Sequence, residues 1–129
     1  MITYGFTKEV DTPFEKILET IPDALKKEGF GILTKIDLQE KFKEKLGIEF
    51  MKYVILGVCH PPSAHKSILV EENIGLMLPC SIIVYEKGGK TAVSIIKPTN
   101  AMSMIGNKEL TRIAEDVEAK LKRVFESIK

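Results

Sequence analysis

The chain has 129 residues, of which 44% are hydrophobic and 29% are charged. A chain of this length and balance can bury a sizeable core without help from disulfides or metal ions. Its 19 Lys and Arg residues against 18 Asp and Glu residues leave a net charge of +1. That near-neutral total argues against the basic surface that nucleic-acid-binding proteins carry, so no nucleic-acid partner is expected.

No apolar run approaches the ~18 residues that a membrane-spanning helix requires, so no membrane partner is expected. The first residues form neither a basic leader nor a long apolar stretch, which argues against a secretory signal. The sequence holds two cysteines, and in an intracellular protein these are typically reduced thiols rather than a structural bridge. We therefore expect a cytoplasmic protein.

The first third of the chain predicts a strand followed by a helix. Apolar residues alternate through residues 2–10, as in a half-buried strand. Thr12 and Pro13 then suit the cap and the first position of a helix whose apolar stripe runs to Gly29. Pro22 lies inside that stripe, and we expect it to kink or split the helix.

The middle of the chain predicts two more strands and two short helices. Residues 30–36 are rich in strand-forming side chains. Asp37 is expected to cap a highly charged helix that ends at Gly47 and lies on the surface. Residues 52–60 are apolar on both faces, which predicts a strand inside the sheet. Residues 63–72 form a weak third helix.

The last third predicts a hairpin and a long helix. Residues 80–87 and 90–97 read as strands joined at Gly88 and Gly89, a strong hairpin signal. Residues 101–106 are expected to be an apolar loop that contains methionines. An unbroken helical stripe runs from Leu110 to Ile128, with acids in its early turns and bases in its later ones, as the helix dipole favours.

The predicted order is strand, helix, strand, helix, strand, helix, strand, strand, helix. This order, and the alternation within the strands, favour an α+β fold with one five-stranded, mainly antiparallel sheet packed on one face by helices. No internal repeat or linker divides residues 1–129, so a single α+β domain is expected.

Two cysteines supply the one chemically suggestive feature. Cys59 ends the third predicted strand and Cys80 begins the fourth. If these strands are antiparallel neighbours, the two cysteines lie side by side, because opposed residues have Cβ atoms about 4.5–5.5 Å apart. If the connection is a parallel crossover, the cysteines lie at opposite ends of the sheet.

Proximity of the cysteines would allow three kinds of chemistry. A redox dithiol is one, although the pair lacks the spacing of a Cys-x-x-Cys motif. A soft-metal site is another, with Cys59, Cys80 and His65 as ligands for zinc or cuprous copper and methionine thioethers nearby. The third is a nucleophilic Cys59 activated by a histidine. Strand alternation would turn His60 away from Cys59, which counts against joint ligation.

The competing interpretation is that both cysteines are inert. Free cysteine is among the most buried residue types and packs as a small hydrophobe, and both cysteines continue apolar strands. The glycines at residues 29, 31, 88 and 89 match no phosphate-binding fingerprint. The sequence therefore contains no complete catalytic or cofactor motif and leaves the cofactor unknown.

Three segments form a set of motifs, namely residues 29–37 (GFGILTKID), residues 53–61 (YVILGVCHP) and residues 75–86 (GLMLPCSIIVYE). Together they resemble the signatures of domain-of-unknown-function family 302. The resemblance extends over nearly the whole chain, but His60 stands where relatives commonly have asparagine after the first cysteine. It implies a fold similar to the TATA-binding-protein-like class, in which a curved antiparallel sheet grips a long C-terminal helix. The family has no established activity, and the fold name is no evidence for DNA binding.

The leading hypothesis is a non-enzymatic homodimer that binds a small ligand or a soft metal ion. The ligand-binding residues would be Cys59, Cys80, His60 and Met102, the metal ligands would be Cys59, Cys80 and His65, and no residue would be catalytic. One alternative is a thiol-dependent enzyme or redox dithiol that uses the two cysteines. A second alternative is an oligomeric scaffold in which the cysteines are purely structural.

Overall fold

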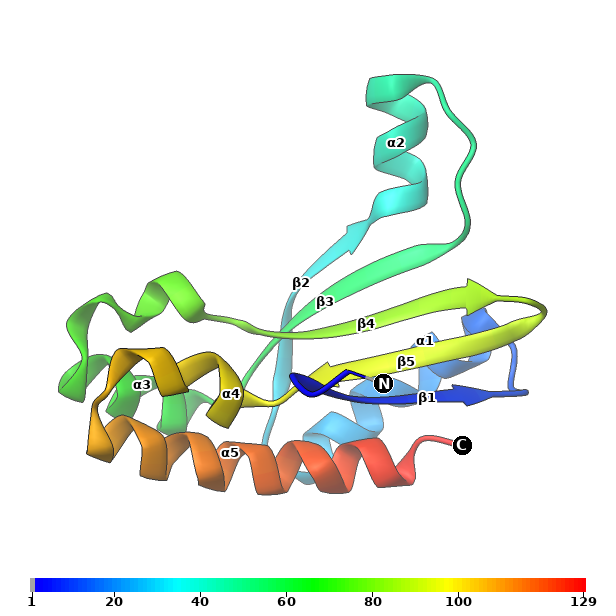
Figure 1. Cartoon of the computed structure of the whole chain (residues 1–129). Coiled ribbons are helices and arrows are strands. Elements are labelled where there is room, and N and C mark those ends of the chain that lie inside the picture. The colour runs from blue at the N-terminus through cyan, green and yellow to red at the C-terminus, as the bar shows by residue number, and fades with distance from the viewer. Residues whose placement is uncertain (1) are drawn as a thin grey trace.

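A computed structural model describes residues 2–129 and contains one five-stranded antiparallel sheet (Figure 1). The strand order across the sheet is β1-β5-β4-β3-β2, and every neighbouring pair is antiparallel. This arrangement confirms the predicted α+β fold and the predicted order of elements. The strands are β1 (Gly5–Val10), β2 (Gly31–Asp37), β3 (Tyr53–Cys59), β4 (Cys80–Lys87) and β5 (Lys90–Ile96).

Helices cover one face of the sheet, and one helix projects away from it (Figure 1). The longest is the C-terminal helix, which runs along the covered face. No helix within residues 2–129 combines the length and apolar character needed to cross a bilayer. The helices are α1 (Phe14–Lys27), α2 (Leu38–Leu46), α3 (Pro61–Val70), α4 (Pro98–Met102) and α5 (Lys108–Ser127), with short 3-10 turns η1 (Glu72–Met77) and η2 (Ser103–Ile105).

The core lies between the sheet and the apolar stripes of α1 and α5. Rows of opposed residues cross β3, β4 and β5, and all of them are buried because this is the face that the helices cover. The stripe predicted for the last helix supplies the other wall. The strand rows are Val54, Val84 and Val93, then Leu56, Ile82 and Ile95, and the helix residues are Val117, Leu121 and Val124.

Helix α1 differs from its prediction at both prolines. It runs unbroken through Pro22, so the helix is not split there, as one of the two expectations had it. Burial of Ile17 and Ile21 against the core outweighs the one hydrogen bond that proline removes. The N-cap is Pro13 rather than Thr12, and the Thr12 hydroxyl instead donates to the Lys129 carbonyl at 2.7 Å.

Two other segments begin or fold differently from the sequence expectation. Residues 101–106 are not a loop, because α4 and η2 occupy most of them. Helix α3 begins at Pro61, two residues before the predicted start. Proline suits the first turn of a helix, where its missing N–H would have no partner. The predicted cap at Asp37 is confirmed, since its carboxylate accepts from the Glu40 N–H at 3.1 Å.

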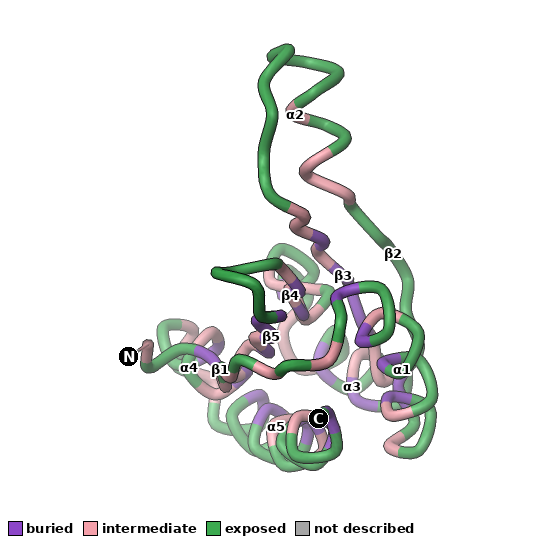
Figure 2. Tube along the Cα trace, turned by 90° about the vertical axis from the view of Figure 1, so that its right-hand side faces the viewer, coloured by how far each residue is buried: buried purple, intermediate pink, exposed green. Residues whose placement is uncertain are grey.

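Residues 38–52, which we call the arm, project from the sheet at the end of β2 (Figures 1 and 2). They comprise α2 and the segment that returns to β3. No residue of α2 is buried, as the sequence predicted for a surface helix. Contacts within the arm include the Phe42 and Phe50 rings at 5.0 Å and a hydrogen bond from Gln39 to the Phe50 carbonyl. At its end, Lys52 forms an ion pair with Glu15 of α1.

Candidate functional site

A cavity of about 340 Å³ lies at the end of the sheet where α3, α4 and the start of α5 gather. Its lining draws on both buried clusters of the fold. Phe30, Val58 and Val117 belong to the cluster under the sheet, whereas Met102 and Leu110 belong to a smaller cluster under α4. The cavity therefore occupies the junction at which these two clusters meet without filling the space between them.

The lining of this cavity is apolar apart from a few uncharged polar groups. It contains no aspartate, glutamate, lysine or arginine side chain. The polar groups are two thiols, one imidazole and two hydroxyls. The full lining comprises Phe30, Leu33, Val58, Cys59, His60, Ser63, Ala64, Ser67, Ile68, Gly75, Leu78, Pro79, Cys80, Pro98, Met102, Leu110, Ile113, Ala114 and Val117.

The two cysteines lie on neighbouring antiparallel strands, which resolves the choice between the two topologies. Cys80 opposes Val58, so Cys59 is one residue out of direct register with it. Both cysteines are free and half-buried, and both line the cavity. The predicted proximity at one end of the sheet is therefore confirmed, with a stagger of one residue.

Burial shapes the acid–base behaviour of both thiols. It raises the pKa of Cys80 to about 11, with a further contribution from a negative charge on Cys59. Burial also raises the pKa of Cys59. Both groups are thus neutral thiols at pH 7, whereas nucleophilic or metal-binding cysteines are stabilised as thiolates.

His60 lines the same cavity as Cys59, contrary to the expectation that it faces away. The alternation that suggested opposite faces ends at Cys59, because the next residue is the N-cap of α3 and the chain turns into that helix. The imidazole Nδ1 lies 2.8 Å from the Ser63 hydroxyl, and the ring lies 5.3 Å from that of Phe30.

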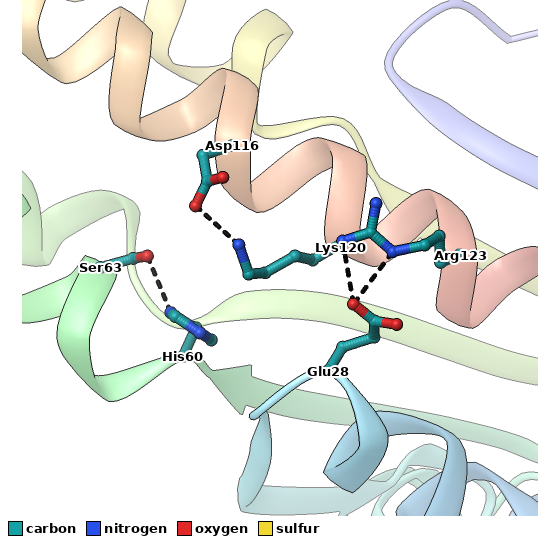
Figure 3. A network of polar contacts seen from close by, with 6 residues as sticks. All are labelled: Glu28, His60, Ser63, Asp116, Lys120 and Arg123. Carbon is teal, nitrogen blue, oxygen red and sulfur yellow. Dashed lines mark hydrogen bonds and ion pairs between the residues drawn. The ribbon is translucent and has the colours of Figure 1, made fainter.

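Charged side chains flank the outer side of His60 (Figure 3). Asp116 and Lys120 of α5 form an ion pair at 2.8 Å, and Arg123 reaches across to Glu28 at 3.0 Å. Burial lowers the pKa of His60, and the charge on Lys120 lowers it further. The imidazole is consequently neutral at pH 7 and presents one donor and one acceptor.

The remaining predicted residues divide between the cavity and the surface. Met102 is buried and lines the cavity. His65 is exposed on α3 and does not line it. Within residues 2–129, no three His, Cys, Asp or Glu side chains gather closely enough to hold a metal ion. The structure therefore brings together Cys59, Cys80, His60 and Met102, but it does not bring His65 to them.

Sequence reasoning missed two buried serines in the cavity wall. Ser63 contacts His60, and the Ser67 hydroxyl donates to the Ser63 carbonyl at 2.8 Å. Both lie on the inward face of α3, with 8% and 6% of their surfaces exposed. Their spacing of four residues, which places them on one face of a helix, was the available signal.

The fold and cavity define an α+β domain in which an antiparallel sheet and its helices enclose an uncharged pocket. The model of the domain of unknown function DUF302 matches residues 6–128, and the chain belongs to this family. The chain is 32% identical in sequence to an uncharacterized conserved DUF302 protein from Bacillus stearothermophilus, and the crystal structure of that protein superposes on it with a TM-score of 0.92. The match covers 99% of this chain and 100% of that one. No curated protein matches.

Proposed function

We propose that this domain binds a small, uncharged and mainly apolar ligand in the cavity beside Cys59 and Cys80. The observation that supports the proposal is the composition of the wall, in which apolar side chains surround a few polar groups and no full charge. Ligand sites in proteins commonly have this character, with a few polar groups that fix orientation. Cys59, Cys80, His60 and Met102 would be the contact residues.

The size and polarity of the cavity narrow the class of ligand. A volume of about 340 Å³ lies at the lower end of the range for small-molecule sites. Transfer of a charged ligand from water into the cavity would be strongly unfavourable, because no side chain in the wall carries an opposite charge. The neutral imidazole of His60 could accept or donate one hydrogen bond. The proposed ligand is therefore a ring-sized or short-chain molecule with a single hydroxyl or carbonyl group.

The raised thiol pKa values favour this proposal over thiol chemistry. A nucleophile or redox pair would need a stabilised thiolate, whereas burial acts against ionisation of both cysteines. The two cysteines would then contribute contact surface and polarisability rather than reactivity.

Binding of 1-naphthol, followed by its fluorescence, tests the proposal. Its anionic counterpart 1-naphthoate has a similar size and serves as the matched control ligand. We expect saturable 1-naphthol binding and at least tenfold weaker binding of the anion. The proposal fails if neither molecule binds, if both bind equally, or if zinc binds stoichiometrically and excludes 1-naphthol.

A matched pair of variants tests the location of binding. Ala114 lies in the cavity wall on α5 and is 4% exposed, whereas Ala119 on the same helix is exposed. Ala114→Phe should fill the cavity and abolish 1-naphthol binding, while Ala119→Phe should leave it unchanged. Equal effects of the two substitutions, in variants whose circular dichroism matches that of the native chain, would place the ligand elsewhere.

We also propose that the protein is a cytoplasmic homodimer in which both thiols stay reduced. The unpaired cysteines support the compartment, because reduced thiols are typical of the cytosol. The exposed apolar side chains of the arm support the dimer.

A further inference from the structure

We propose that the arm and the free edge of β2 form the interface with a second copy of this chain. The interface rests on the homodimer proposed above and is independent of what the cavity binds. The contact is isologous, so that the same surface on both copies meets about a two-fold axis.

The total accessible surface gives the first argument. The chain exposes 7937 Å², whereas a compact monomer of 14.5 kDa is expected to expose roughly 6,900 Å². The excess of about 1,000 Å² is close to the ~800 Å² that each partner buries in a standard interface. Figure 2 shows a source of this excess, since the tube of the arm is mostly in the colour of exposed residues and has no buried segment.

The distribution of exposed apolar side chains gives the second argument. Twelve large hydrophobic residues are exposed among residues 2–129, and seven of them lie between residues 32 and 51. That segment is about one-sixth of the chain, so the concentration marks an interaction surface rather than scattered exposure. The seven residues are Ile32, Leu33, Ile36, Leu46, Ile48, Phe50 and Met51.

The free edge of β2 gives the third argument. This strand pairs with β3 on one side and is the last strand in the sheet order. The first six residues of β2 are exposed. Proline and lysine are the residues that commonly prevent pairing at an edge strand, and β2 contains no proline and a single lysine, Lys35. Antiparallel contact between the two arms would bring the tip of each arm toward this open edge of the other copy, because each arm continues beyond the end of its own β2 (Figure 1).

Charge on the arm suits a second copy as the partner, because charges of both signs alternate along α2. The helix carries Glu40 and Lys41 near its start and Lys43, Glu44 and Lys45 near its end. Antiparallel contact between two such helices would place Glu40 of each beside the two lysines near the end of the other, and it also opposes the helix dipoles favourably. Nucleic acid or an anionic membrane would need a clear excess of positive charge on this surface. Residues 38–52 contain four lysines and three glutamates, so their charges nearly cancel.

The interface would reach the rim of the cavity at one residue. Leu33 is 64% exposed, lies at the irregular register of β2, and also lines the cavity. A second copy seated on the β2 edge would therefore cover part of the cavity rim.

Sedimentation velocity over the micromolar range tests the interface. We expect a dimer for the native chain and a roughly 100-fold weaker dimer for Leu46→Glu with Ile48→Glu, because the new carboxylates would be buried without partners. The control is Leu69→Glu with Leu76→Glu, which changes exposed leucines at 71% and 88% outside the arm. A monomeric native chain would overturn the proposal, and so would equal effects of the two pairs.

Charge exchange distinguishes contact between two arms from any other dimer. Glu40→Lys with Glu44→Lys makes the helix uniformly basic, and Lys43→Glu with Lys45→Glu makes it mainly acidic. Each variant alone should dimerise at least tenfold more weakly, and an equimolar mixture should form the heterodimer. Homodimers of native strength in both variants, or a mixture that stays monomeric while each variant retains native circular dichroism, would overturn the arm as the interface.

Discussion

The Nδ1 atom of His60 lies 2.8 Å from the hydroxyl of Ser63, across the first turn of α3. This contact fixes the imidazole in the cavity wall and joins the end of β3 to the helix that closes the cavity. It also accounts for a polar group at the boundary of an otherwise apolar wall, because the ring retains a partner when water is excluded.

His60 should titrate below the ordinary histidine value of 6.5, because burial and the neighbouring Lys120 lower its pKa, while Asp116 opposes the shift. A lowered pKa contributes stability that is present above pH 6.5 and is lost as pH falls through the folded-state value. Proton NMR on a His65→Gln background would follow the single remaining imidazole. A midpoint at or above 6.5 would contradict the arrangement of charges around the ring.

Ser63→Ala should lower the free energy of unfolding by about 1 kcal/mol, because the imidazole would lose its partner in a partly buried site. Urea denaturation measures the change. Ser103→Ala is the control, since its hydroxyl donates to the Asn100 carbonyl at an exposed position, and we expect a change within about 0.5 kcal/mol. Equal losses in the two variants would show that the His60 contact adds no stability.

Cys80 should make the fold sensitive to alkali. Its folded-state pKa of about 11 exceeds the ordinary thiol value of 9.0. Its contribution is fully present below pH 9 and is lost as pH rises toward 11, by about 2–3 kcal/mol for a two-unit shift. Denaturation at several pH values should therefore show a steeper decline in the native chain than in Cys80→Ala. Parallel declines would contradict burial of the thiol.

Gly57→Ala should destabilise the protein, because a Cβ there would collide with Thr34 Oγ1 and lie 2.7 Å from Pro79 Cγ. Relief requires the Thr34 side chain and the Pro79 ring to move, and overpacking of this kind costs about 1–3 kcal/mol. Gly75→Ala is the matched control, since a Cβ there meets nothing within 4 Å. Thermal unfolding compares the two variants, and an unchanged melting temperature for Gly57→Ala would contradict the close approach of these strands.

Much of the fold could be predicted from local patterns. The alternation in β1, the hairpin glycines between β4 and β5 and the stripe of α5 each depend on neighbours in sequence. The two hairpin strands and α5 lie within two residues of their predicted bounds, whereas β1 begins at Gly5, three residues after its predicted start. The errors arose where tertiary packing overrides a local rule. Pro22 stays in a continuous helix because Ile17, Ile21 and Leu25 on the same helix are buried, and residues 101–105 become helical above the small cluster around Met102.

The candidate site was predictable only in part. Its two cysteines could be placed together because, in neighbouring antiparallel strands, the end of β3 and the start of β4 lie at the same end of the sheet. His60 was misplaced, since alternation cannot say where a strand stops and a helix turns the chain. The cavity itself had no signal in the sequence, because it arises where two clusters of side chains fail to fill the space between them.

The arm has a consequence for how this fold can diverge. Its side chains contribute nothing to the two buried clusters, so substitutions within residues 38–52 are released from the packing constraints that hold the rest of the chain. In the proposed arm-to-arm dimer, drift in these residues would change which copies recognise one another while the sheet and cavity stay intact. Two paralogues in one cell could thereby become mutually exclusive assemblies through changes in a single surface segment.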